Sequence, residues 1–354
     1  MTRSATVGAS MVLALALAVT ARADPLEEGL ARYRQNELEQ AVPLFREAVQ
    51  QNPADPDAHA WLAETLRRLH DPESAVRHAR EAIALEACHS FAHTVVADTY
   101  NPQYSSWWRS HADSTWSHLL RAVACDSADG NAWFGIWSEA IRRGRRDLEV
   151  AALRAIVETA FLAPALMAYN RWVLRNLPEN ALLLTNGDMD TYPVLGLQVV
   201  EQMREDVAVV NVSMLNLGWY RRAIQERYSL PAVSVDSLIH VPLNKQAIAS
   251  WMEQQENGTF PRPMTVATTV LAKHFGPRVR DRFQLAGPHW LCLREKAESL
   301  VDTTLIRRSL ESVVPEEFTG PWVGPGIGAP CGSRPRTRWP GTSPEPRCGI
   351  ARRF

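Results

Sequence analysis

Two aspartates lie two residues apart in a polar turn formed by residues 186–190. Because such a turn is a loop, the carboxylates of Asp188 and Asp190 can reach one point. Paired carboxylates suit a hard cation or the hydroxyl groups of a sugar. Gly187 lets the backbone take a positive φ or come close to a ligand. These residues, with Asn186 and Thr191 beside them, form the first half of a candidate ligand-binding site.

A second polar segment follows the next apolar run and supplies Asn211 and Ser213, with Trp219 and Tyr220 a few residues later. The aromatic rings can form a stacking face, so the two segments together predict a polar cleft with aromatic walls for a glycan or small polar ligand. A purely structural interpretation stays open. In that case Asp190 caps a helix, Asp188 ties the turn, and both aromatic rings fill the core.

The elements that must position these residues form a strand–helix–strand unit. Apolar runs at 181–185 and 207–212 predict two covered strands, and a helical pattern with Pro193 in its first turn separates them. A right-handed crossover makes such strands parallel, so their carboxyl ends meet at one edge. More segments of both kinds follow along the chain: apolar ones at 264–270 and 284–293, and helical patterns at 246–256 and 304–313. Together they predict a small α/β domain, residues 163–319, with a mainly parallel sheet.

This segment also carries a family resemblance. The pattern T-N-G-D-x-D-T-x-P at 185–193 continues with R-x-D-V at 204–207, N-x-S at 211–213 and W-Y at 219–220. It resembles a soluble segment of large bacterial membrane proteins that are similar to protein O-mannosyltransferases. Met189 and Tyr192 depart from that family's usual Asn and Phe, and its many membrane spans are missing. The resemblance therefore implies a shared binding domain rather than a shared reaction.

The first half of the chain repeats small residues at a fixed spacing. Gly29, Ala41, Ala48 and Pro53 are followed, 34 residues further on, by Ala63, Ala75, Ala82 and Ala87. Small side chains let antiparallel helices approach closely, and the pattern resembles the tetratricopeptide repeat. We expect a helical solenoid over residues 24–162. The resemblance implies a concave face that binds a protein or peptide partner, although a spacer without a partner is the alternative.

An aromatic-rich insertion, residues 101–113, interrupts the third repeat. The aromatic residues in and around it can form a platform for a sugar or peptide, or can pack over the end of the irregular repeat. They are Tyr100, Tyr104, Trp107, Trp108 and Trp116.

Cysteine and histidine residues near this repeat invite two further interpretations. Cys88 and Cys125 each close a predicted helical hairpin, so they either form a disulfide or remain two small buried thiols. Cys88, His89 and His93 could also hold a metal together with His111, Asp113 and His118. We expect no metal there, because the first two lie in a loop and His93 falls at an ordinary helix-surface position.

Both ends of the chain fall outside the predicted domains. Residues 1–23 have a basic start, an apolar run and an Ala-x-Ala ending, which predicts a signal peptide. Residues 320–354 are rich in Gly, Pro and Arg, which predicts either a disordered tail or sequence that is out of frame.

These features predict an exported, periplasmic or extracellular bacterial protein that does not span the membrane after signal cleavage. A formal net charge of −1 gives no support for a nucleic-acid partner. Its expected role is a protein–protein interaction scaffold in the cell envelope. The alternative is a glycan-binding or glycosyltransferase-related module that uses the turn from Asn186 to Thr191. No cofactor, metal or catalytic residue is assigned, and the sequence leaves open whether the protein is an enzyme.

Overall fold

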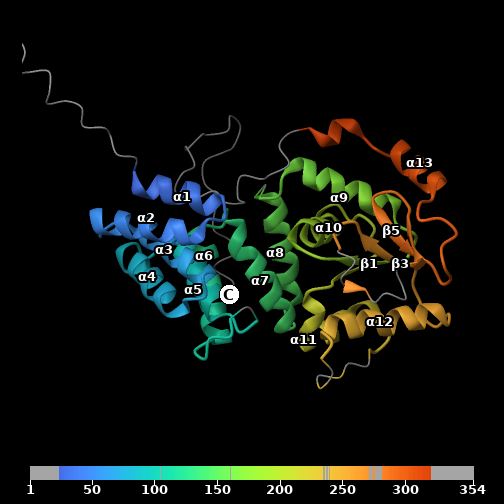
Figure 1. The fold of residues 1–354 in the computed structure, drawn as a ribbon, viewed down its shortest axis with the longest axis horizontal. Helices are drawn as coiled ribbons and strands as arrows, with labels where there is room; N and C mark the ends of the chain where they lie inside the picture. The colour runs from blue at the N-terminus through green and yellow to red at the C-terminus, as the bar shows by residue number, and fades with distance from the viewer. Residues whose placement is uncertain are drawn as a thin grey trace, which may run out of the picture. The chain divides into compact units, whose positions relative to one another are not determined.

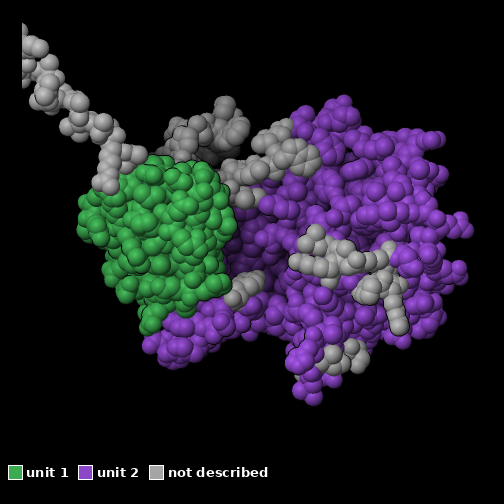
Figure 2. Space-filling model, viewed as in Figure 1, with its two compact units in different colours: residues 1–87 green, residues 88–354 purple. Residues whose placement is uncertain are grey.

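The computed structural model describes residues 24–103, 105–159, 161–233, 236, 238, 240–270, 274–275 and 281–319. The predicted signal peptide, Tyr104 and the predicted tail lie outside the described residues. The chain forms two compact units, residues 1–87 and residues 88–354 (Figure 2). The boundary predicted between residues 162 and 163 stays a prediction.

The described part of the first unit consists of two helical pairs (Figure 1). Three of the four helices begin at an Asp-Pro step, where the aspartate side chain accepts backbone N–H groups of the first turn. Proline fits the first helical position because its missing N–H has no intrahelical acceptor there. The helices are α1 (Pro25–Arg34), α2 (Leu38–Gln51), α3 (Pro56–Arg68) and α4 (Pro72–Leu85).

The small residues predicted to let these helices approach are buried at the contacts. A Cβ atom at Gly29 would lie 2.7 Å from the ring of Phe45, so no larger residue fits there without displacing that ring. Ala63 and Ala75 are fully buried between α3 and α4. The ring of Trp61 packs on Phe45, with centroids 6.4 Å apart. The predicted close packing of a helical repeat is therefore confirmed in this unit.

A pair of histidines joins α3 to α4. The Nδ1 atoms of His59 and His78 lie 3.2 Å apart, and His59 Nε2 lies 3.2 Å from the carbonyl oxygen of Pro53. Since that carbonyl can only accept, neutral His59 carries its proton on Nε2 and accepts at Nδ1 from His78. Burial, followed by the charges of His59, Arg77 and Arg46, lowers the pKa of His78 to about 4, with Asp71 acting in the opposite direction.

We therefore expect the first unit to lose stability in acid. The folded-state pKa of His78 lies below the unfolded value of about 6.5, so its contribution is complete above about pH 6.5 and is lost as the pH falls toward 4. The expected loss is about 1–2 kcal/mol, reduced because the ring is only half-buried. Unfolding curves of the wild type and His78→Asn at pH 7 and pH 4.5 test this. Equal pH dependence of the two proteins would contradict it.

The second unit begins with two more helical pairs and continues into the α/β region (Figure 1). Its first helices are α5 (Ser90–Tyr100), α6 (Ala112–Cys125), α7 (Gly130–Arg142), α8 (Arg146–Glu158) and α9 (Pro164–Asn176). A disulfide joins Cys88, just before α5, to Cys125 at the end of α6. Of the two alternatives for these cysteines, the bridge is the one formed.

The α5–α6 pair repeats the histidine contact of the first unit. The Nδ1 atoms of His93 and His118 lie 2.9 Å apart. His93 is buried, so its predicted helix-surface position is wrong. Hairpin packing turns this face of α5 toward α6, and the neighbouring imidazole then supplies the polar partner that a buried ring needs. Within the described residues, no group of three or more His, Cys, Asp or Glu side chains could hold a metal ion.

The α/β region is built on a five-stranded sheet with the order β2-β1-β3-β5-β4. Strands β1 and β2 are parallel neighbours, as predicted, and β3 is a parallel neighbour of β1 on its other side. Strand β5 runs antiparallel to both β3 and β4, so the sheet is mixed. The strands are β1 (Leu182–Thr185), β2 (Ala208–Asn211), β3 (Met264–Ala267), β4 (Phe283–Leu285) and β5 (His289–Cys292).

The apolar segment at 284–293 is a hairpin rather than one strand. Its turn contains Gly287, whose φ of +121° is strained for any residue with a side chain. A Cβ atom at this position would also lie 2.5 Å from the Ser309 hydroxyl. The glycine thus permits both the reversal and the close approach of helix α13 (Thr303–Glu311), and the reversal lets β5 and β4 join the sheet beside β3 as a pair of strands antiparallel to each other.

Helices cover both faces of the sheet, as in a three-layer fold. In Figure 1, α9 and α10 lie above the sheet and α12 lies below it. No described helix combines the length and apolar character that crossing a bilayer requires. The remaining elements are α10 (Asp188–Val200), η1 (Met214–Asn216), α11 (Gly218–Tyr228), α12 (Leu243–Glu256), α13 (Thr303–Glu311) and η4 (Pro315–Phe318).

Candidate functional site

The two polar segments singled out in the sequence lie at one edge of the sheet. Strands β1 and β2 are parallel neighbours, and Thr185 pairs with Asn211 in their register. The turn after β1 and the turn after β2 therefore begin side by side at the carboxyl ends of the strands. Ligands of α/β proteins commonly bind at such an edge.

Asp190 is a structural residue of the first turn. It is only 3% exposed. Its carboxylate accepts the backbone N–H of Asn186 at 2.9 Å and that of Gly187 at 2.8 Å. The hydroxyl of Thr269 donates to the same carboxylate. Asp190 lies in the first turn of α10, where a negative charge also stabilises the helix dipole.

Three more candidate residues are engaged inside the protein. The hydroxyl of Thr191 contacts the hydroxyl of Thr185 at 2.7 Å and accepts the side-chain amide of Asn211 at 3.0 Å. The side-chain oxygen of Asn211 accepts the backbone N–H of Ser213, which orders the second turn. Tyr220 is buried, and its hydroxyl accepts the backbone N–H of Asn211 at 3.0 Å. Burial raises the pKa of Tyr220, so this phenol stays protonated.

The other polar candidates face outward. The side chains of Asn186, Asp188 and Ser213 make no hydrogen bond within the described part of the chain. Asp188 is exposed at its surface, yet nearby protein atoms desolvate its carboxyl, and this effect, followed by the charge of Asp190, raises its pKa. The partly exposed ring of Trp219 packs edge-on against Tyr220, with centroids 5.9 Å apart.

Of the two uses expected for Gly187, a positive φ or a close approach of the backbone to a ligand, the positive φ is not found. Its backbone is extended, with φ −147°, because the Asp190 carboxylate holds the N–H groups of this turn. A Cβ atom at Gly187 would meet nothing within 4 Å, so the space beside this backbone is open. The arrangement leaves one exposed carboxylate, Asp188, rather than a pair converging on one point.

Two residues that hold the turn were not identified from the sequence. Thr269 lies just beyond β3 and reaches Asp190, while the Asn170 side chain donates to the carbonyl oxygen of Met189 at 2.9 Å. Asn170 could have been noticed in the sequence, because it interrupts an otherwise apolar stretch in α9. No sequence pattern identifies Thr269, because its role depends on the pairing of β3 with β1.

We expect Asp190→Asn to lower the free energy of unfolding by about 1–2 kcal/mol, because the amide nitrogen cannot accept one of the two backbone N–H groups. Thermal or urea unfolding measures this. Asp188→Asn is the matched control, since the same change at an exposed carboxyl without hydrogen bonds is expected to alter stability by less than about 0.5 kcal/mol. Equal effects of the two substitutions would contradict the structural role of Asp190.

Two family models match separate parts of the chain. The family model "Tetratricopeptide repeat" matches residues 32–87, and the model "TMEM260-associated domain 2" matches residues 166–256. The second range includes every candidate residue of the site. The likeness to O-mannosyltransferase-related proteins stays a prediction.

Among solved structures, the chain is similar to a thermophilic TPR protein of Thermus thermophilus, with a TM-score of 0.37 and 17% identity over 58% of this chain and 95% of that one. It is also similar to the MamA protein, with a TM-score of 0.32 and 11% identity over 59% of this chain and 96% of that one. No curated protein matches the chain at a significant level.

Proposed function

We propose that this chain is an exported scaffold whose helical repeats bind a protein or peptide partner in the cell envelope. The observation that carries the proposal is the match of residues 32–87 to the tetratricopeptide model, in a segment that folds as closely packed helical pairs. Two-helix repeats of this kind stack so that each contacts its neighbours and together present an extended binding surface.

The disulfide supports export. Bridges such as Cys88–Cys125 persist in oxidising compartments and are rare where thiols are kept reduced. The presence of this bridge agrees with the signal-peptide pattern of residues 1–23, which ends at Ala23. Expression of the full chain in a bacterium, followed by N-terminal sequencing of the periplasmic fraction, tests this part. Export predicts a mature N-terminus at Asp24, whereas uncleaved protein in the cytoplasm would overturn it.

The insertion between α5 and α6 provides one exposed contact for such a partner. Tyr100 packs against Trp107 with centroids 5.4 Å apart, and the guanidinium group of Arg143 lies 5.1 Å from the Trp116 ring. Trp108, in contrast, is 80% exposed and stacks with Arg109 at 4.5 Å. Packing within the protein therefore accounts for Tyr100, Trp107 and Trp116, and a binding role remains for Trp108.

We expect Trp108→Ala to reduce partner capture from a periplasmic extract at least about fivefold, because exposed aromatic anchors dominate many interfaces. Its melting temperature should not change, since the ring is exposed. Quantitative mass spectrometry of proteins captured by the full chain gives the readout. Leu238→Ala is the matched control, because Leu238 is 87% exposed outside the repeats. Equal capture by the wild type and the Trp108 variant would remove this residue from the proposed interface.

A second candidate function uses the site at the carboxyl edge of the sheet. The side chains of Asn186, Asp188 and Ser213, which make no hydrogen bond with any described residue, and the partly exposed ring of Trp219 favour a glycan or other polyhydroxy ligand. A glycan array with the wild type and Asp188→Ala tests it, because Asp190 must stay intact to hold the turn. Binding that survives Asp188→Ala unchanged, or an array without any signal, would contradict this second function.

A further inference from the structure

The disulfide between Cys88 and Cys125 lies at the surface of the second unit. Cys88 is exposed and Cys125 is half-buried, whereas Cys292 in β5, which has a free thiol, is only 3% exposed. Thiol–disulfide exchange begins when a thiolate reaches one of the two bonded sulfur atoms, so its rate depends on access to that sulfur. The exposure of Cys88 therefore favours attack on the bridge without prior unfolding.

The two bridged cysteines lie at helix ends of opposite polarity. Cys88 directly precedes His89, the N-cap of α5, whereas Cys125 is the last residue of α6. A helix carries a partial positive charge at its N-terminus and a partial negative charge at its C-terminus. An incoming thiolate is an anion, so the N-terminus of α5 attracts it and the C-terminus of α6 repels it.

The carboxylates next to the bridge in sequence also favour Cys88 on balance. Asp126 directly follows Cys125 and is half-buried, so its charge adds to the repulsion at that end of the bridge. Glu86 lies two residues before Cys88 and opposes the attraction there, but it is exposed, where water and salt screen its charge. Exposure and charge thus agree that Cys88 Sγ is the sulfur atom that a thiolate attacks.

Contacts other than the bridge hold α5 against α6. The Nδ1 atoms of His93 and His118 lie 2.9 Å apart. At the end of the pair opposite the bridge, the backbone N–H of His111 donates to the carbonyl oxygen of Tyr100 at 2.8 Å. These contacts do not involve the cysteines, so they remain available to keep both thiols close together when the S–S bond opens.

We propose that Cys88 is a site of reversible thiol–disulfide exchange in the folded protein, with thiols as its co-substrates. An incoming thiolate forms a bond to Cys88 Sγ while the S–S bond breaks, and its electron pair leaves on Cys125 Sγ, which takes a proton from water. A second thiolate then attacks the incoming sulfur and releases the Cys88 thiolate. The bridge gains two electrons, and two thiols become one disulfide. This goes beyond the scaffold function, because it assigns a reaction to the chain.

The rate at which dithiothreitol opens the bridge tests the proposal. The full chain is used in oxidised form, with Cys331→Ser and Cys348→Ser to remove the thiols that lie outside the described residues. At about pH 8 without denaturant, where part of the reagent is thiolate, alkylation and mass spectrometry should show a rate that rises in proportion to dithiothreitol. Cys292 is the internal control and should stay unmodified, because it is buried.

A rate that does not depend on the concentration of dithiothreitol would overturn the proposal, because opening would then wait for unfolding. Modification of Cys292 at the same rate as the bridge opens would overturn it for the same reason.

Two single-cysteine variants in the same background identify the sulfur that reacts. Cys125→Ser leaves the thiol of Cys88, and Cys88→Ser leaves that of Cys125, so each is the matched control of the other because both lack the bridge. With oxidised glutathione, we expect the Cys88 thiol to form a mixed disulfide at least about tenfold faster than the Cys125 thiol. Equal rates, or a faster reaction of Cys125, would overturn the assignment to Cys88. If either variant unfolds, the rate measured on the bridged chain still decides whether exchange occurs in the folded protein.

Discussion

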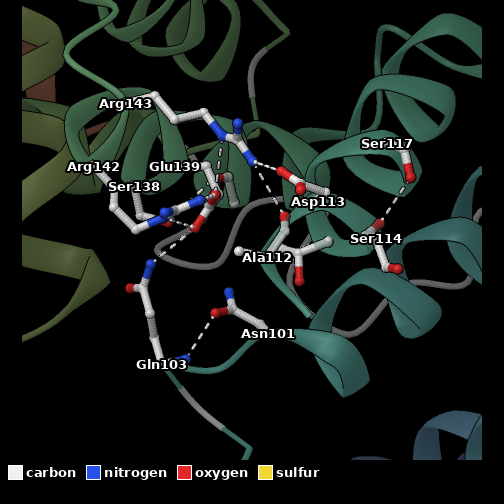
Figure 3. A network of polar contacts seen from close by, with 12 residues as sticks. Asn101, Gln103, Ala112, Asp113, Ser114, Ser117, Ser138, Glu139, Arg142 and Arg143 are labelled. Carbon is white, nitrogen blue, oxygen red and sulfur yellow. Dashed lines mark hydrogen bonds and ion pairs between the residues drawn. The ribbon is translucent and has the colours of Figure 1, made fainter. Parts of the chain in front are cut away.

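Replacing Glu139 with alanine is expected to lower the free energy of unfolding of the second unit by about 3–4 kcal/mol, as removal of one member of a buried ion pair does. The Glu139 side chain is completely buried on α7, and its carboxylate is the centre of the network in Figure 3. It accepts Arg142 Nη2 at 2.6 Å, Arg143 Nε at 3.4 Å and the amide of Gln103 at 3.0 Å. Without it, two guanidinium groups and one amide lose their shared acceptor.

The same substitution should loosen the insertion, residues 101–113. Gln103 contacts α7 through Glu139, while Arg143 holds the other end by donating to Asp113 at 3.0 Å and to the carbonyl oxygen of Ala112 at 3.3 Å. The Arg143 charge lowers the pKa of Asp113, mainly through that hydrogen bond. Limited proteolysis of Glu139→Ala should therefore cut within 101–113 faster than it cuts the wild type.

Glu149→Gln is the control for this experiment. Glu149 is also a buried carboxylate shared by two arginines, but it lies on α8, and both of those arginines lie outside the insertion. We expect comparable destabilisation without faster cleavage at 101–113. If both variants are cut equally fast there, the cleavage reports general unfolding, and Glu139 does not specifically hold the insertion.

The helical half could be predicted well because its signals are local. Small residues at a fixed spacing indicate where two helices touch. Gly29 is one of these residues, and in the structure it lies against the ring of Phe45. The Asp-Pro steps mark helix starts within two residues of sequence. The two predicted parallel strands β1 and β2 could be identified for the same reason, since each is a continuous apolar run.

The polar interior could not be predicted, because each contact there depends on a distant partner. The sequence left open whether Asp188 and Asp190 converge on a ligand or hold the turn, and the hydrogen bond from Thr269, beyond β3, to Asp190 is the part of the answer that no local pattern gives. Glu139 resembles any helical glutamate until the insertion places Gln103 against it.

Loss of the disulfide is expected to lower the stability of the second unit by about 3–4 kcal/mol. The bridge spans 37 residues, including all of α5 and α6, so opening it gives the unfolded chain much more conformational freedom. The double variant Cys88→Ser, Cys125→Ser should show this loss in urea unfolding at neutral pH. The wild type should show the same loss when a strong reductant is added.

The double variant with the reductant is the control, since it has no bridge to open and its stability should not change further. Cys292, which is buried and unpaired, is present in both proteins, and burial raises the pKa of its thiol to about 12, so it stays protonated and unreactive. Equal stability of the oxidised wild type and the double variant would show that packing of α5 and α6 suffices without the bridge. If the loss occurs as expected, this helical pair depends on an oxidising compartment, which ties the stability of the fold to the proposed export.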